Sequence, residues 1–102
     1  MTDEKIGEIK TIIRDFIRLV ESAGRIVAPY YLHYGPREYM DILKNYLPGN
    51  APDLSRIAEI FNESRYSLHL LETGKKREFR LSIDRVLAGI GEFSRRIRKE
   101  PV

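Results

Sequence analysis

Apolar residues recur at steps of three and four along much of the chain, which is the period of an amphipathic α-helix. Asp3 can cap such a helix, and Gly24 can supply the left-handed residue that often ends one. We therefore predict a first helix over residues 3–23. Its apolar stripe, flanked by Ile12, Ile17 and Leu19, consists of Ile6, Ile9, Ile13, Phe16, Val20 and Ala23.

A second helix is predicted to begin in the stretch "GPREY". Gly35 stands at the cap position, Pro36 at the first helical position and Glu38 at the third, where a carboxylate can reach back to the cap. The stretch Pro48-Gly49-Asn50 then stops the helix. The apolar face that this register predicts comprises Tyr39, Ile42, Leu43, Tyr46 and Leu47.

Two further helices follow in the pattern. Pro52 and Asp53 begin one that runs to about Arg65, with Leu54, Ile57, Ala58, Ile60 and Phe61 at helical spacing. A turn at Thr73-Gly74 precedes a long one, whose apolar positions are Phe79, Ile83, Val86, Ile90, Phe93 and Ile97. Gly89 and Gly91 interrupt this last helix, so we expect either close helix packing or a bend there.

The segment "RIVAPYYLHY" between the first two helices has mixed signals. Ile26, Val27 and its tyrosines favour a strand, whereas Pro29 disfavours one. We predict an ordered, Tyr-rich loop whose rings point inward over the helices while the hydroxyls stay in water. The expected fold is a single all-α domain over residues 1–102, a small bundle of about four helices.

The amino-acid composition limits the kinds of fold and of chemical site that the chain can form. The chain has 102 residues, 42% of them apolar, which suits one compact core, and it has no cysteine for a disulfide, a thiolate metal site or a nucleophile. Its apolar runs are far shorter than the roughly 20 residues of a membrane span. The acidic N-terminus lacks the order of a signal peptide, so we expect a mature, non-exported segment, and it stays open whether Met1 is the natural start.

The sequence contains no strong signal of a catalytic site. Glu59 and Glu63 lie four residues apart, a spacing that usually marks a solvated helix face, and His33 and His69 have no helically spaced second ligand. The serines lie outside any nucleophile motif, and no Gly-rich phosphate loop follows a strand. The sequence thus predicts a protein that is not an enzyme, with no cofactor, metal or small-molecule substrate.

Positive charge gathers near the end of the chain. The overall net charge is +3, but residues 75–99 hold nine basic and three acidic residues, a net charge of +6. The candidate surface for a partner comprises Arg95, Arg96, Arg98 and Lys99, together with Arg37, which has no evident structural role. A solvated helix end is the default reading; contact with an anionic membrane surface and nucleic-acid binding are the alternatives.

Two short motifs, "GPREY" and "FNESRYSLH", carry a family resemblance. Their order and spacing resemble the helical C-terminal domain, of unknown function, of bacterial and archaeal membrane proteins related to protein-glutamine gamma-glutamyltransferases. The likeness covers about residues 24–90, although Gly35, Asn62 and Ser64 depart from the usual Thr, Glu and Ala. The matching residues are Pro36, Glu38, Tyr39, Phe61, Arg65 and Tyr66.

This resemblance implies a cytoplasmic domain, tethered to the membrane in the full-length protein, with no activity of its own. The transglutaminase chemistry of such proteins belongs to a separate domain with a Cys-His-Asp set, and none of it transfers to a chain without cysteine. We accordingly expect a non-catalytic interaction or regulatory domain with a protein partner. We also expect Glu38 and Arg65 to pair between the second and third helices, with Tyr39 and Tyr66 packed nearby.

Overall fold

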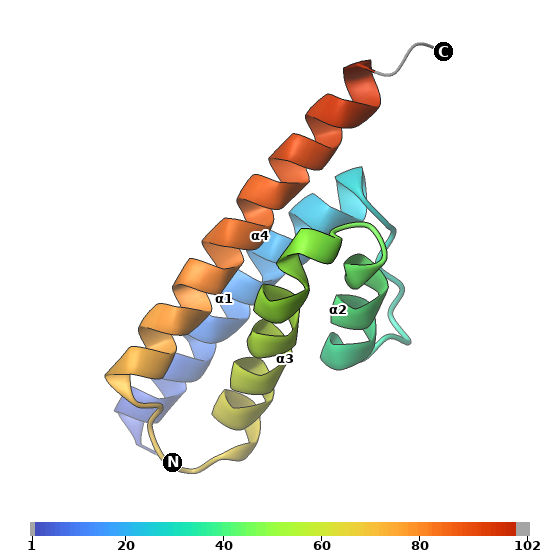
Figure 1. Cartoon of the computed structure of the whole chain (residues 1–102). Coiled ribbons are helices and arrows are strands. Elements are labelled where there is room, and N and C mark those ends of the chain that lie inside the picture. Colours follow the sequence, from blue (N-terminus) through green and yellow to red (C-terminus); the bar gives the residue numbers. More distant parts are fainter. Residues whose placement is uncertain (1, 100–102) are drawn as a thin grey trace.

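Helix α3 (Ala51–Tyr66) lies at the centre of the structure and packs against each of the other three helices (Figure 1). The structure is a computed structural model, and it describes residues 2–99. The other elements are α1 (Asp3–Ile26), α2 (Pro36–Lys44), the short 3-10 helix η1 (Pro48–Asn50) and α4 (Thr73–Lys99). The predicted all-α bundle of about four helices is confirmed, and within residues 2–99 there is no strand.

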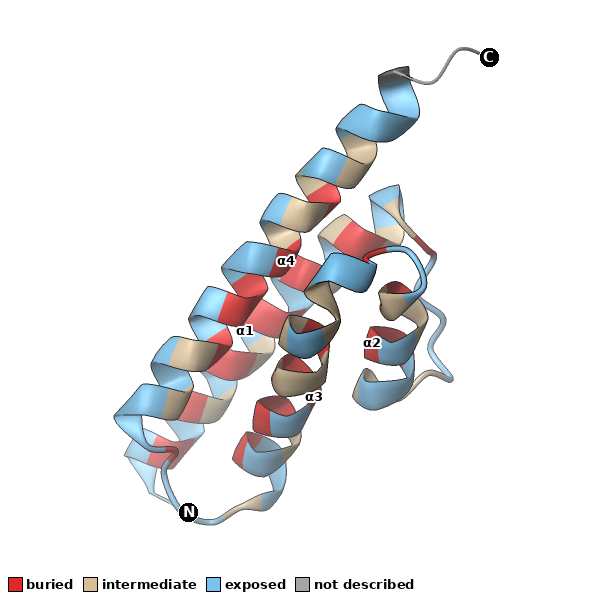
Figure 2. Cartoon of the chain, in the orientation of Figure 1, coloured by how far each residue is buried: buried red, intermediate tan, exposed pale blue. Residues whose placement is uncertain are grey.

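The core lies where the four helices face one another. α3 runs antiparallel to α1 and α4, and the buried positions of these helices turn toward each other (Figure 2). Every helix contributes fully buried apolar side chains. Examples are Leu19 and Ala23 in α1, Tyr39 and Leu43 in α2, Leu54 and Ile57 in α3, and Ile83 and Val86 in α4.

The buried face of α1 differs from the predicted stripe. Ile6 is 38% exposed, and Ile9, Ile13 and Val20 are only half-buried. The face that packs against the core is rotated toward α4 and includes three charged residues that the pattern had placed in water. Its members are Lys5, Glu8, Ile12, Asp15, Phe16, Leu19 and Ala23.

The ends of α1 also correct the prediction. The cap is Thr2 rather than Asp3, because the hydroxyl of Thr2 accepts a hydrogen bond from the backbone N–H of Lys5 at 3.1 Å. Gly24 does not end the helix, since α1 continues to Ile26 and no described glycine has a positive φ.

Helix α2 begins as the sequence predicts, with Gly35 at the cap and Pro36 in the first turn. It ends at Lys44, earlier than expected, because the chain turns through Asn45 and Tyr46 before the proline. The preceding segment is indeed a loop. Its tyrosines form an aromatic cluster, although Tyr31 is about half exposed rather than turned inward.

Helix α4 starts at Thr73, so the Thr73-Gly74 pair lies within the first turn and the true connection is residues 67–72. Gly89 permits a close approach, because a Cβ at this position would clash with Oδ1 of Asn50, at the end of η1. Gly91 has open space around it. Beyond this point α4 extends past the other helices, which gives the molecule extents of 54 × 28 × 18 Å (Figure 1).

Candidate interaction site

An apolar groove of about 380 Å³ runs between α1 and α3. The loop before α2 closes its far side. We call it the α1–α3 groove. Its lining consists of Ile13, Phe16, Ile17 and Val20 from α1, Phe61 and Arg65 from α3, and Tyr30, Tyr34 and Pro36 from the loop and the start of α2.

Two phenylalanines form the floor of the groove. The rings of Phe16 and Phe61 lie 4.3 Å apart between centroids, tilted by 31°, and both side chains are buried. Because one ring comes from α1 and the other from α3, their contact fixes the spacing of these two helices. The floor is therefore an apolar surface to which both helices contribute.

The α1 wall is an apolar row that the other described residues cover only in part. Ile17 is 47% exposed, and Ile13 and Val20 are half-buried. Ile6 continues the row toward the N-terminus, since positions 6, 13 and 20 are seven residues apart and so fall on one side of a helix. The residues of this row belong to the apolar stripe that the sequence predicted. They lie outside the core because the buried face of α1 is rotated away from that stripe.

The opposite wall is aromatic, and Tyr39 holds it in place. Tyr30 meets the Tyr39 ring edge-on at 5.0 Å, and Tyr34 stacks beside it at 6.3 Å. Tyr39 is fully buried, and its hydroxyl donates to the carbonyl oxygen of Ala28 at 2.8 Å. Burial, with a smaller contribution from Tyr30, raises the pKa of Tyr39 to about 12.

Arg65 is the charged residue in the lining of the groove. Its guanidinium carbon lies 5.6 Å from the centroid of the Phe61 ring and 5.7 Å from that of Tyr66, within the range of cation–π contacts. It forms no ion pair with any residue in 2–99. The guanidinium therefore keeps its hydrogen-bonding capacity at the rim of an apolar surface.

The expected contact between Glu38 and Arg65 is wrong. No ion pair or hydrogen bond joins these two described residues. The side chain of Glu38 instead lies close to Gly35, since its Oε1 would be 3.6 Å from a Cβ added to that glycine. Tyr66 is 78% exposed while Tyr39 is buried, so the two tyrosines do not share a packing site. Among the described residues Glu38 forms neither the expected ion pair nor a side-chain hydrogen bond to the cap.

Among the six motif residues, the structure brings Pro36, Phe61 and Arg65 together in the groove, with Tyr39 directly behind its aromatic wall. Sequence reasoning did not anticipate the groove itself. The available signal was the width of the apolar stripe in α1, because a helix with more apolar positions than one core contact requires has a second face to cover.

A second, polar cleft of about 450 Å³ lies between the starts of α1 and α4. Glu8, which lines this cleft, accepts a hydrogen bond at 2.7 Å from the Nζ of the fully buried Lys5, and the same Nζ donates to the carbonyl of His69 at 2.8 Å. The backbone N–H of Leu71 donates to Oε1 of Glu8 at 2.8 Å, and Lys76 lies 3.5 Å from the same oxygen. This network fastens the α3–α4 connection to α1.

Opposing effects act on the pKa of Glu8 in this cleft. Burial alone would raise the pKa of Glu8, but the hydrogen bonds from Lys5 and from the Leu71 N–H, together with the nearby ammonium groups, lower it below its usual value. Asp15, also buried, and the bases Arg77 and Arg80 line the rest of the cleft. Both carboxylate oxygens of Glu8 are thus already bonded within the chain.

None of the remaining described candidate residues lines the groove or the cleft, although the ring of His33 lies 4.6 Å from that of the groove residue Tyr34. Glu59 pairs with Arg56, and Glu63 pairs with Lys75, each at the partly exposed surface. His33 packs against Tyr31, with ring centroids 5.9 Å apart. Among residues 2–99 no group of three acidic, histidine or cysteine side chains is placed to hold a metal ion.

No helix within the described part of the chain combines the length and the apolar character that crossing a membrane requires.

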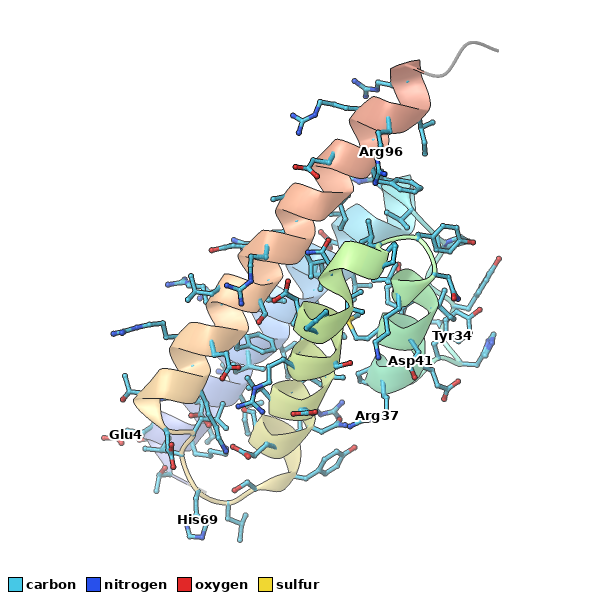
Figure 3. The ribbon with its side chains drawn as sticks, viewed as in Figure 1. Glu4, Tyr34, Arg37, Asp41, His69 and Arg96 are labelled. Atoms are coloured by element: carbon cyan, nitrogen blue, oxygen red, sulfur yellow. The ribbon has the colours of Figure 1, made fainter. Side chains whose placement is uncertain are left out.

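The predicted basic surface is split. Arg37 is exposed at the start of α2, whereas Arg95, Arg96 and Arg98 are exposed near the end of α4, so the two parts lie in different regions of the molecule (Figure 3). The side chain of Lys99 lies outside the described residues.

No family model matches this chain, and neither a curated protein nor a solved structure is detectably similar to it.

Proposed function

We propose that this protein is a non-catalytic interaction domain that binds another protein through the α1–α3 groove. The observation that carries this proposal is the exposed Ile17 beside the Phe16–Phe61 floor. A continuous apolar surface of this kind is costly to leave in water and commonly marks a binding site. The groove also has a floor of two buried aromatic rings and few polar groups, which is the usual make-up of such sites.

Its proposed setting is the cytoplasmic side of a membrane-associated protein. Support comes from the resemblance described above, together with the fact that Pro36, Phe61 and Arg65 of its two motifs line the groove. A regulatory domain tethered in this way would bind a partner at the membrane without contributing chemistry.

A selection from a random peptide library displayed on phage tests the interaction function. The wild-type chain is used as bait beside Ile17→Gln and Leu81→Gln, which replace two aliphatic residues that are both 47% exposed. Leu81 lies on α4, outside the groove. We expect selected peptides to bind the Leu81→Gln variant normally and the Ile17→Gln variant about tenfold more weakly.

Two results would contradict the proposal. One is a selection from which no specific peptide emerges. The other is a set of peptides that bind the Ile17→Gln and Leu81→Gln variants equally well, because such peptides would be using a surface other than the groove.

The end of α4 supports a second candidate function, which is contact with an anionic surface. Ile97 is 53% exposed there, between exposed Arg95, Arg96 and Arg98, so this helix end combines an apolar residue with clustered positive charge. Basic amphipathic helices of this composition bind anionic lipid surfaces. Nucleic acid is the competing ligand for the same charges.

Charge reversal separates these ligands. We expect an Arg95→Glu/Arg96→Glu/Arg98→Glu variant to lose sedimentation with phosphatidylserine vesicles while keeping its helical circular dichroism. A mobility shift with single- or double-stranded nucleic acid at micromolar protein and low salt, without any vesicle binding, would favour the nucleic-acid alternative. If the wild-type chain binds neither the vesicles nor nucleic acid, the second candidate function is wrong.

A further inference from the structure

We propose that the α1–α3 groove binds an amphipathic α-helix of another protein, and that this helix brings a carboxylate to Arg65. This inference rests on the interaction function proposed above and specifies the chemistry of the partner. It draws on three features: the length of the apolar row of α1, which lines the groove from Ile13 to Val20 and continues beyond it to Ile6, the nature of the two walls of the groove, and a guanidinium at its rim that has no ion-pair partner among residues 2–99.

The length of the row fits a helix. With a rise of about 1.5 Å per residue, the row from Ile6 to Val20 extends over about 21 Å, the length of four helical turns. The seven-residue spacing of Ile6, Ile13 and Val20 is the repeat by which one helix packs along another. An added strand is disfavoured, since residues 2–99 contain no sheet edge that could pair with one.

The walls of the groove supply sites for apolar anchors. Aliphatic side chains of a docked helix would enter between Ile17 and Val20 on one side and Tyr30 and Tyr34 on the other, above the Phe16–Phe61 floor. Aromatic walls of this kind often dominate the binding free energy, because the rings are large and already ordered. Here Tyr39 orders them through its contacts with Tyr30 and Tyr34.

The positive charge of Arg65 indicates which charged group the partner helix carries. Arg65 has no ion-pair partner among residues 2–99, and its contact with the Phe61 ring holds the guanidinium at the edge of the groove. A carboxylate that arrives on a docked helix can form charge-assisted hydrogen bonds there while water is excluded by the apolar contact below. An ammonium group at the same place would be repelled.

Two synthetic peptides test this proposal. Both are fluorescein-labelled, about 18 residues long, and carry leucines at helical spacing; one has glutamates beside the leucine stripe and the other has lysines at the same positions. Fluorescence anisotropy titrations use the full chain. We expect the glutamate peptide to bind about tenfold more tightly than the lysine peptide.

Four variants localise the effect. Ile17→Gln should weaken binding of the glutamate peptide by about tenfold, and Arg65→Glu should abolish or reverse the preference for glutamate over lysine. The matched controls Leu81→Gln and Arg95→Glu change residues outside the groove and should retain wild-type affinities. Circular dichroism checks that every variant stays helical and that the bound peptide gains helix.

Several outcomes overturn the inference. Equal affinity for the two peptides, or equal effects of Arg65→Glu and Arg95→Glu, would remove the role of Arg65. Concentration-dependent dimerisation of the wild-type chain that Ile17→Gln abolishes would assign the groove to a second copy. If the phage selection yields Ile17-dependent peptides that bind without becoming helical, the interaction function stands and the helical partner is wrong.

Discussion

The ammonium group of Lys5 lies 2.7 Å from the carboxylate of Glu8, and both side chains are almost completely buried. Two unlike charges at a three-residue spacing thus occupy the core face of α1, where the sequence pattern predicted water. The same two groups bind the backbone of the α3–α4 connection through His69 and Leu71. These hydrogen bonds join residues 64 and 63 positions apart in the chain, so the loss of either side chain should lower the stability of the fold.

Removal of one partner from this pair should destabilise the protein strongly. Lys5→Met leaves the buried Glu8 carboxylate without its closest counter-charge, which should lower the free energy of unfolding by about 3 kcal/mol. Urea denaturation measures this change. Lys10→Met, which alters an exposed lysine of the same helix, is the control, and equal stability of the two variants would contradict the proposed network.

Acid should weaken the same network. Because the pKa of Glu8 is lower in the folded chain than its usual 4.5, its ionised form stabilises the fold fully above that value, and this contribution is lost as the pH falls toward the folded pKa. We expect unfolding free energies to decrease between pH 6 and pH 3 by less in Glu8→Gln than in the wild type. Glu21→Gln, which changes an exposed glutamate of α1, should keep the wild-type decrease.

Two glycines of α4 should respond to alanine in different ways. Gly91 has open space around it, so Gly91→Ala should stabilise the protein by up to about 1 kcal/mol through helix propensity. At Gly89 an added Cβ would displace the side chain of Asn50 from its hydrogen bonds to Asp53 and to the Arg85 carbonyl. Gly89→Ala should therefore be less stable than Gly91→Ala by about 1–2 kcal/mol in thermal unfolding. Equal stabilities would show that η1 does not pack closely on α4.

Tyr39 should ionise well above the ordinary pKa of a tyrosine. Its pKa is raised to about 12 by burial, so its neutral form stabilises the fold below pH 10, and this contribution is lost as the pH rises toward 12. Ultraviolet titration should show one late transition that Tyr39→Phe removes. The same variant should lose about 1 kcal/mol of stability, because the Ala28 carbonyl loses its donor. A Tyr39→Phe chain that retains the late transition would assign it to another ring.

Local sequence signals predicted most of the helices because their causes are local. Gly35 and Pro36 fix the start of α2, and the apolar period from Phe79 to Ile90 gives the correct buried face of α4. These features depend on backbone conformation and on one amphipathic pattern. Neither requires knowledge of which elements meet.

The α1–α3 groove and the correct phase of α1 could not be derived in this way. Lys5 and Glu8 look solvated in a linear pattern, and only their distant partners at His69 and Leu71 make their burial favourable. Once these two residues face the core, Ile6 and Ile17 turn outward. The apolar row of the groove is thus a consequence of a long-range polar network.

The outward row of α1 is proposed as a binding surface, and chemical-shift mapping tests this proposal most directly. The glutamate peptide is titrated into the uniformly ¹⁵N-labelled chain, and amide shifts are followed by residue. We predict that the largest changes fall on residues 13–20, 30–36 and 61–65, and that they disappear in Ile17→Gln but persist in Leu81→Gln. Shifts concentrated in the last turns of α4 or in the polar cleft between α1 and α4, or shifts that survive Ile17→Gln, would contradict the account.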